Sequence, residues 1–230
     1  MSLDPDINFF NISIWVLPVL LAITLHEAAH AFVAWKLGDD TAYVQGRVTI
    51  NPINHIDPIG TFFLPGLLLL TGSPFLFGWA RPVPVDFNRL RNPRRDMVLV
   101  ALAGPASNVA MAIIAALLFH LVQYVPEMAH EWVAKSLLNM IRINLVLAAF
   151  NMLPIPPLDG GRVAVGLLPD ALARPLASLE RHGFMILIGL LFFLPMVGNF
   201  VGVRLNLFEV VVSPMIAFLL DFVRFVTFHG

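Results

Sequence analysis

The chain contains no cysteine, which excludes a disulfide framework, thiolate catalysis, and zinc or iron–sulfur sites held by cysteine. Charged residues are also scarce, because they make up 13% of the 230 residues, against about 25% in a typical soluble domain. There is no excess of basic residues either, since the formal net charge is −1, so nothing indicates nucleic-acid binding. The residues before the first apolar run include two acids and no base, so a secretory signal peptide is not expected.

Hydrophobic residues account for 58% of the chain, and its mean hydropathy is +0.82. A helix that crosses a bilayer needs about 20 predominantly apolar residues. The apolar runs that approach this length are 12–37, 59–79, 97–122, 137–154, 184–203 and 207–228. The sequence therefore predicts an all-α polytopic membrane protein with about five transmembrane helices, and we expect residues 1–230 to form a single membrane-embedded domain.

Three other segments carry local signals of their own. The run at 59–79 is divided by proline and glycine, which favours a re-entrant hairpin over a straight crossing. Residues 41–50 are rich in β-branched and aromatic side chains around Gln45 and Gly46, which predicts a small membrane-associated β-hairpin. Residues 160–183 have a helical period with charges on one side, which is typical of a segment at the membrane surface.

Residues 26–30 read His-Glu-Ala-Ala-His within the first apolar run. On a helix, His26 and His30 lie one turn apart on the same face, where two imidazoles can bind one metal ion, with Glu27 beside them as a general base. Ionisable residues inside a membrane span are costly and usually functional. The alternative is a polar helix face that lines a pore or pairs with another helix.

Two histidines leave a catalytic zinc one protein ligand short, because such ions usually have three. Asp159 is the best candidate, since it follows the fourth run in a segment where three prolines cannot continue a helix. Irregular backbone at membrane depth is tolerated only inside a protein or beside a water-filled cavity. The alternative for Asp159 is an ordinary cytosolic helix terminus with a solvated carboxylate, since clusters of proline and glycine usually mark turns.

Three motifs together resemble the site-2 protease family of intramembrane zinc metalloproteases. They are the HEAAH sequence at 26–30, the Gly-Pro-Ala-Ser-Asn sequence at 104–108, and the N-x-x-P-x-P-x-L-D-G segment at 151–160. The resemblance covers residues 12–165, which we take as the catalytic core, with C-terminal helices at 184–228. It implies a compact member of the family, without the PDZ or nucleotide-binding domain that many members carry.

The resemblance also implies roles for individual residues. Three side chains would bind one Zn²⁺ per chain: His26, His30 and Asp159. Glu27 would activate the zinc-bound water, and Asn108 and Asn151 would hold the substrate or the transition state. The alternative for the two asparagines is hydrogen bonding between helices.

One further histidine stays open. His55 lies between the first two apolar runs, and it is either an accessory zinc ligand or a loop histidine paired with Asp57.

A shared metal site places His26, His30 and Asp159 at one depth, which requires an odd number of crossings between the first and fourth runs. The run at 59–79 would then re-enter instead of crossing. With the amino terminus outside, most basic residues lie inside, as the positive-inside rule requires. Five of them follow the 59–79 run: Arg81, Arg89, Arg91, Arg94 and Arg95. We therefore expect an active site nearer the cytosolic face of a prokaryotic inner membrane.

The expected function is hydrolysis of a peptide bond within or near the transmembrane segment of a single-spanning membrane protein. The substrate would unwind locally and pair as a strand with an edge at 41–50. The expected partners are such substrates and the lipid bilayer, with no nucleic acid, and the sequence leaves the oligomeric state open. Alternatives are a zinc or other cation transporter and a catalytically silent membrane scaffold. A transporter has no chemical need for Glu27.

Overall fold

The structure, a computed structural model, describes residues 9–64, 67, 78, 80–202 and 206–228. Within these ranges the chain is helical, and no strand is present. Among the described residues, five helical stretches are long and apolar enough to cross a membrane, namely Phe9–Lys36, Pro93–Phe119, Glu127–Asn151, Asp170–Gly198 and Phe208–Thr227. The predicted all-α polytopic membrane fold is therefore confirmed.

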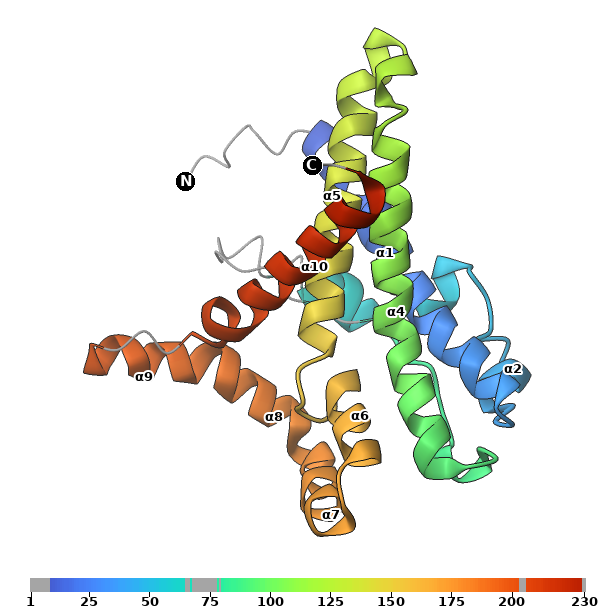
Figure 1. The fold of residues 1–230 in the computed structure, drawn as a ribbon, viewed down its shortest axis with the longest axis vertical. Helices are drawn as coiled ribbons and strands as arrows, with labels where there is room; N and C mark the ends of the chain where they lie inside the picture. The colour runs from blue at the N-terminus through green and yellow to red at the C-terminus, as the bar shows by residue number, and fades with distance from the viewer. Residues whose placement is uncertain (1–8, 65–66, 68–77, 79, 203–205, 229–230) are drawn as a thin grey trace.

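The core of the molecule is a bundle of α1 (Phe9–Lys36), α4 (Pro93–Phe119) and α5 (Glu127–Asn151), which pack against one another. Figure 1 shows α1 and α5 running in one direction and α4 in the other. The last helix, α10 (Ser213–Thr227), crosses back over α4 and α5. The carboxyl halves of α1 and α5 thus lie toward the same end of the bundle, as a site shared between them requires.

Small residues allow these helices to approach closely. Alanines with at most 4% exposure line the contact surfaces of all three: Ala22, Ala31, Ala34, Ala101, Ala112, Ala115, Ala116, Ala148 and Ala149. In lipid there is little hydrophobic drive between helices, so close packing and hydrogen bonds hold them together. Between α1 and α5, the Trp132 indole donates to Ser13 Oγ at 2.8 Å, and Asn139 Nδ2 donates to the Ile14 carbonyl at 3.2 Å.

Two short helices follow α5 at one end of the bundle, α6 (Asp159–Leu167) and α7 (Asp170–Ser178). Arg94, near the start of α4, holds them in place. Its Nε donates to the Gly166 carbonyl at 3.0 Å, its Nη2 donates to the Leu168 carbonyl, and its Nη1 pairs with Asp170 Oδ1 at 2.7 Å. This anchor places the first residue of α6 beside the bundle.

The helical run that contains the penultimate apolar stretch begins before that stretch. We expected the apolar run to start at residue 184, and the helical run that carries it extends over Asp170–Gly198, with charged residues in its first part. It contains α7, α8 (Gly183–Ile188) and the first part of α9 (Leu194–Val201), joined by one 3-10 turn and one π turn. The helical character predicted for 160–183 is thus confirmed, and its place at the membrane surface stays a prediction.

The β-hairpin predicted at 41–50 is wrong. Residues Thr41–Val44 form a single helical turn, α2, and the chain then continues without a strand to residue 50. The turn begins because the Asp39 carboxylate accepts hydrogen bonds from both the backbone N–H and the hydroxyl of Thr41. Tyr43 stacks on Trp35 of α1 with ring centroids 4.9 Å apart. These contacts fold the segment onto α1, so it has no second strand to pair with and no edge to offer a substrate.

The re-entrant hairpin predicted at 59–79 lies mostly outside the described residues. Its first part is visible as a π-helical turn, Pro58–Phe63, which begins where Asp57 Oδ1 accepts from the backbone N–H groups of Ile59 and Gly60. Whether the run re-enters or crosses therefore stays a prediction.

The alanine packing can be tested with a matched pair of substitutions on α4. Ala112 is fully buried against Ala116, Leu145 and Val223, whereas Ala110 is exposed on the same helix. Ala112→Leu should destabilise the protein by about 1–3 kcal/mol through overpacking, and Ala110→Leu should not. Thermal unfolding in detergent, followed by near-ultraviolet circular dichroism, checks this. Equal midpoints for the two variants would contradict the packing.

Candidate metal centre

The two histidines of the HEAAH sequence lie on one face of α1, as their spacing predicts. His26 and His30 are 7% and 9% exposed, and their Nε2 atoms lie 3.0 Å apart. Both rings are buried in the bundle and lie directly against Gly104 of α4. Two imidazole nitrogens therefore converge on one buried point.

Hydrogen bonds at the far side of each ring orient this pair. His26 Nδ1 lies 2.6 Å from Asn108 Oδ1, and His30 Nδ1 lies 2.7 Å from the Val100 carbonyl oxygen. A carbonyl oxygen only accepts, so each Nδ1 carries the hydrogen. In the neutral imidazole the Nε2 lone pair is then free. Metal-binding histidines are typically held in this way, because the second nitrogen fixes both tautomer and ring orientation.

Asp159 completes the cluster from a distant part of the chain. It is the first residue of α6, it is 6% exposed, and its Oδ2 lies 3.3 Å from both Nε2 atoms. The turn before it is very tight, since a Cβ on Gly160 would lie 2.2 Å from the Met152 carbonyl oxygen. Glycine at this position lets the start of α6 press against the end of α5, and this brings the Asp159 carboxylate inward.

The three side chains fit a zinc ion. Asp159 Oδ2 is buried and accepts no hydrogen bond of good geometry, although two imidazole nitrogens lie close to it. One ligand atom from each of the three residues lies within 4.8 Å of the others. Two histidines and one carboxylate are a common set for catalytic zinc, which keeps a fourth position open. The donor chemistry and the orphaned oxygen therefore both favour a metal at this point.

The protonation of Asp159 agrees with that role. Burial alone would raise the pKa of its carboxyl, but the adjacent His26 and His30 outweigh burial and hold this pKa well below its usual range. The carboxylate is therefore ionised at neutral pH, as a metal ligand has to be.

Glu27 lies next to His26 in the chain but points to a different partner. Its Oε2 accepts a hydrogen bond of 2.8 Å from the backbone N–H of Val83, and its side chain is half-buried. None of the described residues donates a hydrogen bond to Oε1. One oxygen is thus held in place, and the other has no hydrogen-bond donor among the described residues.

The two asparagines of the predicted site differ in their surroundings. Asn108 is fully buried, and besides His26 it contacts the Ala22 carbonyl at 3.2 Å and Asn144 Oδ1 at 2.7 Å through Nδ2. Both polar atoms of its side chain have partners, which agrees with the alternative of hydrogen bonding between helices, and one of these bonds orients His26. Asn151 donates to the Leu147 carbonyl of its own helix at 3.0 Å, and among the described residues no hydrogen bond joins it to the three clustered side chains.

Sequence reasoning missed Asn144 and Val100. Asn144 is fully buried on α5 and receives the hydrogen bond from Asn108, while its own Nδ2 donates to the Met140 carbonyl at 2.8 Å. A polar residue within the apolar run 137–154 was a usable signal. The carbonyl of Val100 left no trace in the sequence, because every residue has one.

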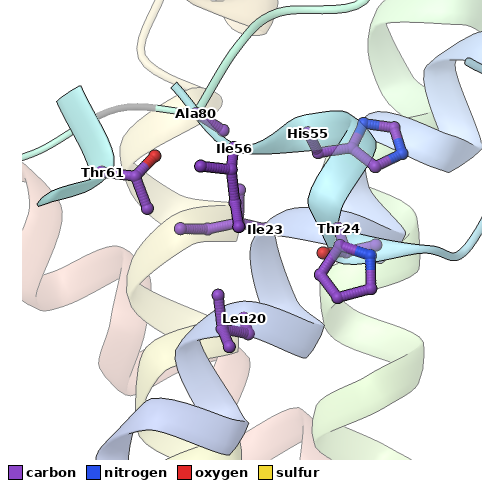
Figure 2. Close-up of a pocket in the computed structure, with 8 residues that line it drawn as sticks. Leu20, Ile23, Thr24, His55, Ile56, Thr61 and Ala80 are labelled. Atoms are coloured by element: carbon purple, nitrogen blue, oxygen red, sulfur yellow. The ribbon is translucent and has the colours of Figure 1, made fainter. Parts of the chain in front are cut away.

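His55 lies outside the cluster. Its ring is 2% exposed, and its Nε2 lies 2.9 Å from the Thr49 carbonyl. Figure 2 shows it at one side of a small pocket against α1, among mainly apolar side chains: Leu20, Ile23, Thr24, Pro52, Ile56, Thr61 and Ala80. The pocket volume is about 10 Å³, which suits at most about one water molecule. The predicted partner Asp57 instead caps the following turn.

Comparison with known proteins gives the same picture. The model of peptidase family M50 matches residues 120–196. YwhC of Bacillus subtilis is 42% identical over 190 residues, which cover 81% of this chain and 82% of that protein. MJ0611 of Methanocaldococcus jannaschii is 44% identical over 162 residues (69% and 73%), and Rip2 of Mycobacterium tuberculosis H37Rv is 32% identical over 190 residues (83% and 71%). The name of each begins "Putative zinc metalloprotease". No solved structure matches the chain at a significant level.

Gly104 offers a direct test of the cluster. A Cβ at this position would lie 2.3 Å from His30 Nε2 and 2.5 Å from His26 Cε1. Because the rings are held at Nδ1, Gly104→Ala should displace the Nε2 atoms and bring the zinc content well below the roughly one ion per chain expected of the wild type. Gly189→Ala is the control, since a Cβ there meets nothing within 4 Å. Elemental analysis of the purified variants checks this, and an unchanged zinc content in Gly104→Ala would refute the geometry.

The orienting role of Asn108 can be tested against another buried asparagine. Asn108→Leu removes the acceptor of His26 Nδ1–H and should weaken zinc binding about 10- to 100-fold. Asn139→Leu removes an asparagine whose side chain, within the described residues, donates to the Ile14 carbonyl and makes no hydrogen bond to the cluster, so it should leave zinc affinity near the wild-type value. Competition with a fluorescent zinc chelator measures both. Similar affinities in the two variants would contradict the assignment.

Proposed function

The chain belongs to peptidase family M50, the site-2 protease family of zinc metalloproteases, and we propose that it hydrolyses a peptide bond within or near the transmembrane segment of a single-spanning membrane protein. The observation that carries this proposal is the buried His–His–Asp set, enclosed by apolar helices, with a carboxylate next to it in the chain. Ionisable side chains are costly among membrane helices, and where they occur they are usually functional.

Zinc is the cofactor of this family, and we propose His26, His30 and Asp159 as its ligands. When bound there, the ion supplies a Lewis acid that polarises a carbonyl group and lowers the pKa of water. The protein contributes the orientation of the three ligands, through Asn108 and Val100 for the histidines and through the glycine turn for Asp159. It also excludes bulk water, because all three side chains are buried.

Glu27 is the proposed general base. Its carboxylate would take a proton from the attacking water and return it to the nitrogen of the leaving amine, so that one residue serves both halves of the reaction. The hydrogen bond from Val83 holds Oε2, which leaves Oε1 for the proton. Glu27 does not belong to the proposed ligand set, so its removal should affect turnover and not metal binding.

The substrate proposal follows from the membrane position of the site. A peptide bond within a transmembrane helix is shielded by its own hydrogen bonds, so the substrate has to unwind before it can be cleaved. Asn151 is half-buried, and its Oδ1 accepts no hydrogen bond from a described residue, so we propose that this oxygen contacts the unwound backbone.

The chain is an integral membrane protein, and we propose the orientation derived from its charges. The parallel course of α1 and α5 supports an odd number of crossings between them (Figure 1). With the amino terminus outside, the basic residues between 81 and 95 lie in the cytosol, and the metal centre is nearer that side. Two of the relatives compared above come from bacteria, which supports a prokaryotic inner membrane.

The experiment compares zinc content and proteolysis in four forms of the protein. Wild type, His26→Ala, Asp159→Ala and Glu27→Gln are purified, analysed for metal, and reconstituted with quenched fluorogenic transmembrane peptides. We expect about one zinc in wild type and in Glu27→Gln and little in the two ligand variants. Only wild type should cleave, and mass spectrometry of the products should place the cut in the apolar segment.

The outcomes separate the competing functions. A folded wild-type protein without zinc, or a Glu27→Gln variant with normal turnover, would refute the proposed mechanism. Zinc binding without proteolysis, together with zinc uptake into vesicles that does not depend on Glu27, would point to a transporter instead.

A further inference from the structure

Residues 81–86 form an extended strap beside Glu27. The sequence Arg-Pro-Val-Pro-Val-Asp explains its shape, because proline fixes its own φ and pushes the preceding residue into extended backbone. The structure contains neither helix nor turn over these six residues. The strap follows Ala80, which lies near Ile56 in the pocket of Figure 2, and it continues into the segment that precedes α4.

Backbone hydrogen bonds tie the strap to three separate parts of the chain. The N–H of Arg81 donates to the His55 carbonyl at 2.9 Å, that of Val83 to Glu27 Oε2 at 2.8 Å, and that of Asp86 to Asp39 Oδ2 at 2.8 Å. Pro82 and Pro84 have no N–H to donate. Val83 is thus the one residue between Arg81 and Val85 that can donate to Glu27, and a shift of the strap by one residue would place a proline there.

Arg47 contacts the strap immediately before Val83. Its Nη2 donates to the Arg81 carbonyl at 2.7 Å and reaches the Pro82 carbonyl at 3.4 Å. Its own backbone is held as well, since its N–H donates to the Ala42 carbonyl at 2.8 Å. One guanidinium therefore holds the two carbonyl groups that precede the residue bonded to Glu27.

The burial of this guanidinium is unusual and needs a reason. Arg47 is 6% exposed, its Nε has no hydrogen-bond partner, and no carboxylate of the described residues forms an ion pair with it. Burial lowers the pKa of the Arg47 guanidinium, and the nearby charge of Arg81 acts in the same direction, while the charge of Glu27 raises this pKa without reversing the shift. A buried, unpaired cation is costly, so a purely structural role would be served better by a neutral donor.

We propose that Arg47 is a positioning residue for catalysis, which clamps the strap in the register that lets Val83 fix the Glu27 carboxylate. This inference rests on the proposed function, because it assumes that Glu27 is the general base. The physical reason is that a proton-transfer group has to be held within a fraction of an ångström, and a displacement of about 1 Å lowers the rate about 100-fold. Glu27 lies on a helix, but its carboxylate is kept in place by a donor from another segment.

The test uses Arg47→Ala and Arg47→Lys, with Arg174→Ala as the control, since its exposed side chain makes only a 3.7 Å ion pair with Asp170. Turnover is measured on the quenched transmembrane peptide that wild type cleaves fastest. Arg47→Ala should reduce kcat about 10- to 100-fold with little change in KM. Zinc content should stay at the wild-type level, because Arg47 contacts none of the proposed ligands. Arg174→Ala should behave as wild type.

A second readout follows the strap itself and needs no activity. The chain has no cysteine, so Val85→Cys introduces a single thiol into the strap, where Val85 packs partly buried against the cluster around Ala34, Leu90 and Val100. Maleimide labelling of this thiol should be slow with Arg47 in place and several-fold faster with Arg47→Ala. The lysine variant keeps the charge but offers only a point donor, so it should give an intermediate labelling rate and an intermediate kcat.

Each outcome decides the proposal. Wild-type kcat and labelling in Arg47→Ala would overturn it, and so would loss of zinc or of thermal stability in proportion to the loss of kcat. Full kcat in Arg47→Lys with a loose strap would assign the effect to charge and also overturn the clamp. If wild type cleaves no peptide, the proposed function fails, and the labelling rates alone then decide whether Arg47 holds the strap.

Discussion

The structure depends on the constraint that ionisable and polar side chains among membrane helices have to find partners. His26 and His30 lie in the apolar helix α1, and each satisfies its Nδ1 through an oxygen of α4. Those two bonds direct both Nε2 atoms to one point, and Oδ2 of Asp159, the first residue of α6, lies close to both atoms. The register of α1 against α4 and the position of α6 therefore both affect one small polar cluster.

Outside the cluster, the same constraint sets the architecture around it. The alanine surfaces let α1, α4 and α5 approach closely enough for Asn108 to reach both α1 and Asn144. Arg94 holds the end of α6 and the start of α7 against the start of α4. The strap holds Glu27 through the N–H of Val83, and Arg47 holds the strap. A protease of this kind thus separates ligand orientation from control of the proposed base.

The predictions from the sequence agree with the structure where short spacing or a strong motif carries them. They differ where contacts between distant residues decide the conformation. The i, i+4 spacing of His26 and His30 and the broken segment before Asp159 predicted the three-residue cluster. Residues 41–50 had a strand-like composition, but Asp39 and the Trp35–Tyr43 stack turned them into a helical turn. For Asn108, the sequence left open a contact with substrate or transition state and hydrogen bonding between helices, and the structure shows bonds to His26, Ala22 and Asn144.

By itself, the sequence determined the membrane class, the number of long apolar helices, and the side chains of the metal cluster, because hydropathy and helical periodicity are local properties. Only the tertiary structure decided what each polar group contacts. The Val100 carbonyl, Asn144, Arg47 and the N–H of Val83 became part of the site because helices and strap brought them there. A backbone N–H or carbonyl is present at almost every position, so no pattern of residue types could single out these partners before the chain was folded.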